Sequence, residues 1–174
     1  MNLKDEILRE HSKRQTSKIA RWIGADKQRF RQLMNLFLRG EYRVTQRSAW
    51  IVGQCADRHP QLVVPWLKPM LAKMEEPGVH GAVRRNVVRI LAHIEIPHPL
   101  LGTVVTRCFD YLGSEREEIA VKVHAMMAIL RATRTEPDLK SELKAAIEQL
   151  LPTAGPAVRA RVRIVLKELD QQLS

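Results

Sequence analysis

The stretch VRRNVVRILAHI, residues 83–94, decides the fold of this chain. Its apolar residues recur at i, i+4, i+7, i+8 and i+11, which is the spacing of one face of an α-helix. The same pattern starts again at Val44, Val121 and Val158, so that successive copies lie 39, 38 and 37 residues apart. A period of this length predicts a stack of two-helix units, because no single unit can bury its own apolar face.

Prolines mark where the first helix of each unit begins. Pro60, Pro99 and Pro137 stand at equivalent places, and proline is favoured at the first position of a helix. Pro65 and Pro69 interrupt the helix after Pro60, so we expect a late start or a kink there. The predicted units cover residues 26–58, 60–97, 99–134 and 137–171. Residues 1–25 form an N-terminal cap of one long helix or two short ones, and we expect residues 1–174 to make a single domain.

These units resemble a known repeat family. A hairpin of 37–39 residues whose second helix opens with Val-Arg is similar to the HEAT repeat, and Val83-Arg84, Val121-Lys122 and Val158-Arg159 carry that resemblance. The segment AWIVGQCA, residues 49–56, looks like the related armadillo repeat. The resemblance implies an all-α fold, a right-handed α–α superhelix (a short solenoid) of about four HEAT-like hairpins plus an N-terminal helix. In such solenoids the second helices line the concave binding face.

The chain departs from the HEAT pattern in its acidic residues. The family usually has an Asp about six residues before the basic residue of the second helix, whereas this sequence has Gly78, Arg116 and Thr153 there. The basic column therefore either pairs with neighbouring acids such as Glu75, Glu76 and Glu115, or it faces a partner.

The charge of the chain indicates an anionic partner. The net charge is +10 and the pI is about 10.1, and 19 of the 29 basic residues are Arg, a side chain suited to bidentate contacts with carboxylate and phosphate. The first 47 residues alone carry 12 basic and 5 acidic side chains. Such a surface is compatible with an acidic protein, with DNA or RNA, or with an anionic membrane surface.

Seven residues are candidates for contacts with a partner. They are the basic residues of the second helices and one tryptophan that falls off the apolar face: Trp50, Arg84, Arg85, Arg89, Lys122, Arg159 and Arg163. The indole of Trp50 either stacks on a base or an aliphatic anchor of a partner, or packs on its own hairpin.

The sequence gives no reason to expect catalysis or a cofactor. It has no phosphate-binding glycine loop, no nucleophile elbow and no pair of histidines at metal-ligand spacing, so we expect no cofactor and no metal. Cys55 and Cys108 are expected to be buried apolar residues of a reducing compartment. No apolar run is long enough to span a membrane, and we expect a cytoplasmic protein.

Three functions remain open. The first is a non-catalytic interaction module that binds an acidic protein or peptide on a basic concave face. The second is DNA or RNA binding through the Arg-rich stripe. The third is enzymatic, because DNA glycosylases for alkylated bases have a similar solenoid. They need a carboxylate, and the inner helices offer Asp57 and Glu95. The oligomeric state stays open as well.

Overall fold

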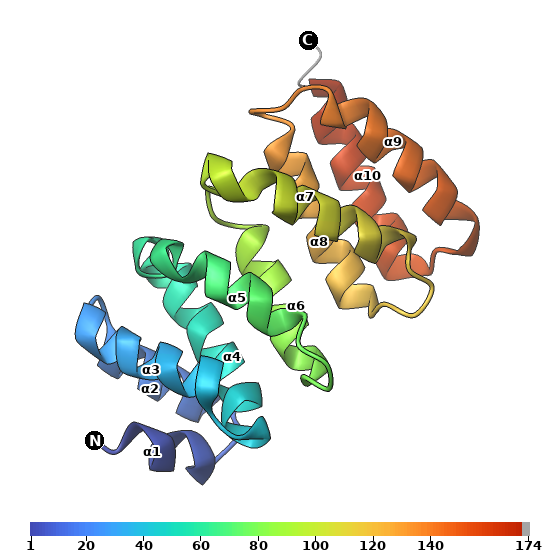
Figure 1. The fold of residues 1–174 in the computed structure, drawn as a ribbon. Helices are drawn as coiled ribbons and strands as arrows, with labels where there is room; N and C mark the ends of the chain where they lie inside the picture. Colours follow the sequence, from blue (N-terminus) through green and yellow to red (C-terminus); the bar gives the residue numbers. More distant parts are fainter. Residues whose placement is uncertain (172–174) are drawn as a thin grey trace. The chain divides into compact units, whose positions relative to one another are not determined.

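The structure is a computed structural model that describes residues 1–171, and within this range the chain consists of helices and their connecting turns (Figure 1). The predicted all-α fold of helical hairpins is confirmed. The chain divides into two compact units, one comprising Met1–Ile90 and the other beginning at Leu91. The right-handed superhelix and the single domain stay predictions.

The first unit opens with a hairpin of two short helices, α1 (Leu3–Arg9) and α2 (Lys13–Ile23). The polar segment around residue 11 interrupts the helix, as the sequence indicated, and separates α1 from α2. The break is stable because Ser12 Oγ accepts a hydrogen bond from the backbone N–H of Gln15 at 3.1 Å and so caps α2. Gly24 ends α2 with a φ of 51°, a conformation that favours glycine.

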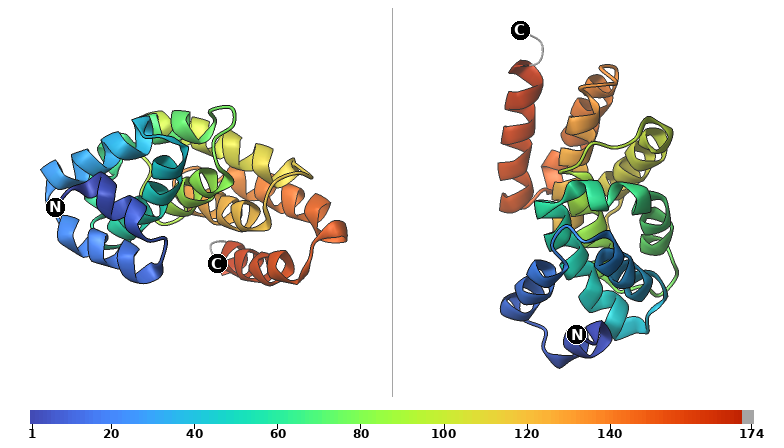
Figure 2. Two further views of the ribbon diagram at one scale, coloured as in Figure 1. Left: turned by 90° about the horizontal axis from the view of Figure 1, so that it is seen from below. Right: turned by 90° about the vertical axis from the view of Figure 1, so that its left-hand side faces the viewer.

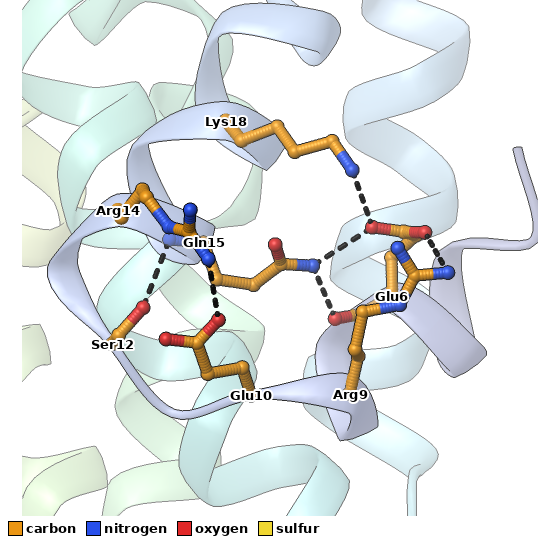
Figure 3. A network of polar contacts seen from close by, with 7 residues as sticks. All are labelled: Glu6, Arg9, Glu10, Ser12, Arg14, Gln15 and Lys18. Carbon is orange, nitrogen blue, oxygen red and sulfur yellow. Dashed lines mark hydrogen bonds and ion pairs between the residues drawn. The ribbon is translucent and has the colours of Figure 1, made fainter.

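A cluster of charged and polar side chains joins these two helices (Figure 3). The amide nitrogen of Gln15 donates both to the backbone oxygen and to the carboxylate of Glu6, each at 2.8 Å. Lys18 Nζ and Arg9 Nη2 lie 3.0 Å from the same carboxylate. These contacts, with Lys18 and Gln15 first among them, hold the pKa of Glu6 below its ordinary value. Glu6 thus connects α1 to α2 at the end of the chain.

The second hairpin pairs α3 (Lys27–Arg39) with α4 (Tyr42–Arg58). Asp26 caps α3 as predicted, because its carboxylate accepts from the backbone N–H groups of Gln28 and Arg29 at 2.8 and 3.0 Å. The helix α4 packs against both α2 and α3. Its predicted apolar face is buried: Val44, Ser48, Ile51, Val52 and Cys55.

The third hairpin shows the predicted effect of its prolines. Two 3₁₀ turns, η1 (Pro60–Leu62) and η2 (Val64–Trp66), precede α5 (Leu67–Met74), and α6 (Gly81–Leu91) follows. The late start of α5 is confirmed. It follows from the missing N–H groups and fixed φ angles of the prolines. The apolar positions of α6 are buried, with Val83, Val87, Ile90 and Leu91 each at most 2% exposed.

The second unit contains two hairpins. One pairs α7 (His98–Gly113) with α8 (Ile119–Ala132), and the other pairs α9 (Leu139–Leu150), extended by η3 (Leu151–Thr153), with α10 (Pro156–Gln171). The helix α8 packs on α7, α9 and α10. Further views show α3 alongside α4 in one unit and α7 alongside α8 in the other (Figure 2). The apolar faces that start at Val121 and Val158 are buried, except that Leu166 is half-buried.

The two cysteines are buried free thiols, as predicted. Burial raises the pKa of both Cys55 and Cys108 to about 12. No helix within residues 1–171 is long and apolar enough to cross a bilayer.

Candidate binding site

A cavity of about 260 Å³ opens in the first unit beside Trp50. Three parts of the chain form it. The loop between α1 and α2 supplies His11, and α4 supplies Gln46 and Trp50. The helix α6 supplies Ala82, Arg85 and Asn86. We call it the Trp50 cavity.

Trp50 is half-buried and is held from one side by the N-terminal hairpin. The ring of His11 meets the indole edge-on, with 5.5 Å between the ring centroids and an angle of 68° between the ring planes. The indole therefore neither lies wholly in the core nor projects freely from the surface. It forms an aromatic wall with one side packed and one side facing the cavity.

A hydrogen-bond chain positions the polar residues of the cavity. His80 Nδ1 accepts from the backbone N–H of Ala82 at 2.9 Å, and so caps the start of α6. His80 Nε2 lies 3.0 Å from the side-chain amide of Gln46. The contact joins two nitrogens, Gln46 Nε2 and His80 Nε2, and the tautomer of the imidazole decides which of them donates. Asn86 Nδ2 donates to the backbone oxygen of Ala82 at 2.8 Å.

Arg85 gives the Trp50 cavity its charge. It is half-buried on α6, on the same helix as Asn86 and one turn beyond Ala82. A guanidinium beside an indole and amide groups is a site for a planar anion that carries an apolar neighbour, because the guanidinium binds the charge while the ring covers the apolar part. Such a lining is chemically suited to an anionic group.

Arg84 and Arg89, which also lie on α6, contact carboxylates of their own unit. Arg89 Nη1 lies 3.0 and 3.3 Å from the two carboxylate oxygens of Asp57, and Arg89 Nη2 lies 3.3 Å from one of them. Arg84 Nη2 lies 3.9 Å from Glu75 and 3.5 Å from the backbone oxygen of Met74. For these two residues the structure shows internal pairing, and for Arg84 it is with one of the acids that the sequence singled out.

The remaining candidates lie in the second unit, where the structure brings two of them to one turn. Arg159 Nε donates to the backbone oxygen of Ala154 at 2.7 Å, and Lys122 lines a cavity of about 340 Å³ that Ala154 also lines. Glu115 and Glu117 line the same cavity, so its charge is mixed. Arg163 is exposed on α10. Of the two cavities, only the one that Lys122 lines contains acidic side chains in its lining.

Sequence reasoning did not assign Gln46, His11 or His80 to the Trp50 cavity and its surroundings, and it did not pair Asp57 with Arg89. Gln46 precedes Trp50 by one helical turn and so shares its helix face. This spacing could have identified Gln46 from the sequence. Nothing in the local sequence relates His11 to Trp50, Asp57 to Arg89, or His80 to Gln46, because each pair is joined only by tertiary packing. Asp57 is also, with Glu95, one of the two carboxylates that the enzymatic alternative has available, and here Arg89 binds it.

No three His, Cys, Asp or Glu side chains within residues 1–171 gather in a way that would hold a metal ion.

Comparison with known proteins supports the repeat architecture. No curated protein and no solved structure matches the chain. The family model for the HEAT repeat domain matches residues 3–169. This match covers nearly the whole chain, so the chain belongs to the HEAT repeat domain family.

Proposed function

We propose that this chain is a non-catalytic interaction module that binds an acidic segment of a partner protein, and that the Trp50 cavity takes one carboxylate of that segment. HEAT repeats generally mediate protein interactions. The observation that carries the proposal is the lining of the cavity, where a guanidinium, an indole, an imidazole and two amides surround one open volume. The net charge of +10 favours an anionic partner over the whole surface.

Arg85 and Trp50 divide the recognition between them. Arg85 binds the carboxylate with two parallel N–H···O hydrogen bonds, the arrangement for which its planar fork is suited. Trp50 covers the methylene groups of the acidic side chain or the apolar residue next to it.

The test is a binding titration with fluorescein-labelled peptides rich in Glu and Asp, compared with peptides in which Gln and Asn replace the acids. We expect the acidic peptides to bind, and Arg85→Gln to weaken them about tenfold, equivalent to about 1.4 kcal/mol. Trp50→Ala weakens binding and Trp50→Phe restores most of it. The matched control is Arg43→Gln, which removes the same charge at an exposed position on α4. Equal weakening by Arg85→Gln and Arg43→Gln contradicts a role for the cavity.

Nucleic acid is the second candidate, because 19 arginines and an indole beside a guanidinium also suit phosphates and bases. It predicts that DNA or RNA of the same length binds more tightly than the acidic peptide, with an affinity that falls steeply as salt rises. Direct competition between a labelled acidic peptide and an unlabelled oligonucleotide separates the two candidates. Displacement of the peptide only at a large excess of oligonucleotide supports the protein partner.

A further inference from the structure

A second cavity, of about 320 Å³, lies in the same unit between α3 and the two 3₁₀ turns. Phe30 and Leu62 form its floor, and both are almost fully buried at 1% and 5% exposure. Pro65 and the half-buried Trp66 also line it, together with Lys27 and Arg31 of α3. We call it the Trp66 groove. It shares no lining residue with the Trp50 cavity.

The prolines of the third hairpin create this groove. A continuous helix from Pro60 to Met74 would present its side chains to α3 at one regular α-helical spacing. Instead, Pro60 and Pro65 each open a 3₁₀ turn, and α5 begins only at Leu67. The tighter 3₁₀ turns place their side chains at a different spacing from an α-helix. The result is a hollow with an apolar floor rather than a closed helix contact.

The charges beside the groove favour an anionic occupant. Lys27 and Arg31 stand four residues apart on α3, so they are neighbours on one exposed helix face. Lys27 is the first residue of α3, where the helix dipole already provides positive potential, and Arg31 lies one turn further on. Two like charges close together at this end disfavour the unbound state slightly, and an anionic ligand removes that cost.

We propose that the Trp66 groove is a docking site for an acidic peptide with one large apolar anchor residue. The anchor packs on Phe30 and Leu62 against the indole of Trp66, and acidic residues beside it meet Lys27 and Arg31. An aromatic or long aliphatic side chain suits the apolar lining of the groove. A large anchor residue in an apolar pocket is typical of interface hot spots. This proposal does not depend on the Trp50 cavity, and either site can fail its test without the other.

The three tryptophans make the two sites separately observable. Trp50 lies in one cavity and Trp66 in the other. Trp22 is a built-in reference, since the Arg29 guanidinium covers its ring at 4.6 Å from the centroid. In a ¹H–¹⁵N correlation spectrum each indole N–H gives its own peak, which is assigned by Trp22→Phe, Trp50→Phe and Trp66→Phe variants.

The probes are short peptides that carry one central leucine, phenylalanine or tryptophan flanked by glutamates, with glutamine-flanked and alanine-centred versions as controls. We expect an anchored acidic peptide to shift the Trp66 indole peak while the Trp22 peak stays in place, and to lose affinity in the glutamine-flanked and alanine-centred versions. Lys27→Glu combined with Arg31→Glu weakens binding about tenfold or more. Acidic residues are favoured at this end of a helix, so the double variant keeps its fold.

The matched control is Arg43→Glu combined with Lys68→Glu, which changes the net charge equally at exposed positions outside the groove lining. Equal weakening by the two double variants overturns the proposal, as does a peptide that binds without moving the Trp66 peak. Failure of every anchored acidic peptide to bind with a Kd below about 100 μM also overturns it. So does an oligonucleotide that shifts the Trp66 peak at lower concentration than any peptide.

Discussion

Replacing Gly53 with alanine tests whether the Asp57–Arg89 pair is held as tightly as its geometry indicates. Gly53 lies in α4, where an added Cβ would stand 2.6 Å from Arg89 Nη2 and 3.4 Å from Asn86 Oδ1. A glycine in a helix interior costs about 0.5–1 kcal/mol relative to alanine, so the helix itself gains from the change. The Arg89 guanidinium must move away, however, and it is the end that contacts Asp57.

The two effects have similar sizes and opposite signs. The side chains of Arg89 and Asp57 are 25% and 48% exposed, so their pair contributes about 1 kcal/mol at most. Gly53→Ala in the native background should therefore change the free energy of unfolding by no more than about 0.5 kcal/mol. In the Arg89→Ala background the clash is gone, and the same substitution should stabilise the protein by about 0.5–1 kcal/mol.

The assay is a double-mutant cycle by urea unfolding, followed by circular dichroism. Arg89→Ala alone should lower stability by about 1 kcal/mol, and the cycle should give a coupling of similar size. Gly53→Ala in the Asp57→Ala background is the control, since a released guanidinium can turn aside and the substitution should again be stabilising. The reasoning is refuted when Gly53→Ala has the same effect in all three backgrounds, because Arg89 is then not fixed.

Four further predictions follow from other parts of the structure. Glu6→Gln should lower the midpoint temperature of unfolding. The variant should also lose less stability than the native protein as the pH falls into the acid range. The lowered pKa of Glu6 means that its contribution is present above about pH 4.5, the ordinary value, and disappears as the pH falls through the folded-state pKa; an unchanged pH profile argues against the Glu6 network. Leu33→Ala, at a fully buried position, should cost about 2–5 kcal/mol in chemical unfolding, and a cost below 1 kcal/mol contradicts the assigned core. Gly24→Ala should cost about 1 kcal/mol because its φ of 51° strains any side chain, whereas Gly155→Ala, with open space around its Cβ, is the control. Cys55 and Cys108 should resist a thiol reagent at neutral pH until the protein is unfolded, because both are buried with pKa values near 12; rapid labelling of the native protein would show that the core opens.

The periodic residues predicted the fold because they report a local and repeated property. The apolar stripes on the second helices are buried apart from the half-buried Leu166. The boundary prolines stand at the start of the next hairpin: Pro60 opens η1, Pro99 is the second residue of α7, and Pro137 precedes α9. The interruption after Pro60 was also predictable, since the chemistry of proline acts within a few residues. The N-terminal cap could be read only as one helix or two. Ser12 settled that by capping α2.

The candidate site was predictable only in part, because it depends on which side chains meet across helices. Trp50 and Arg85 were identified from the sequence, and the structure places them in one cavity. Arg84 and Arg89 belong to the same basic column, but Glu75 and Asp57 lie at the ends of the preceding helices and pair with them. Spacing along one helix gives no information about such contacts. The Trp66 groove was missed because the prolines predicted a bend without predicting what the bend exposes.

His11 has a consequence for how the first unit works. The loop that carries it joins α1 and α2, which Glu6, Gln15 and Lys18 hold together (Figure 3). Arg47 of α4 donates to the backbone oxygens of Ile7 and Leu8 of α1 at 3.2 and 2.7 Å. One side of the Trp50 cavity therefore depends on the packing of the α1–α2 hairpin. A ligand that contacts His11 should slow amide exchange throughout α1 and α2. A change that destabilises these two helices should weaken binding of the ligand by the same coupling free energy.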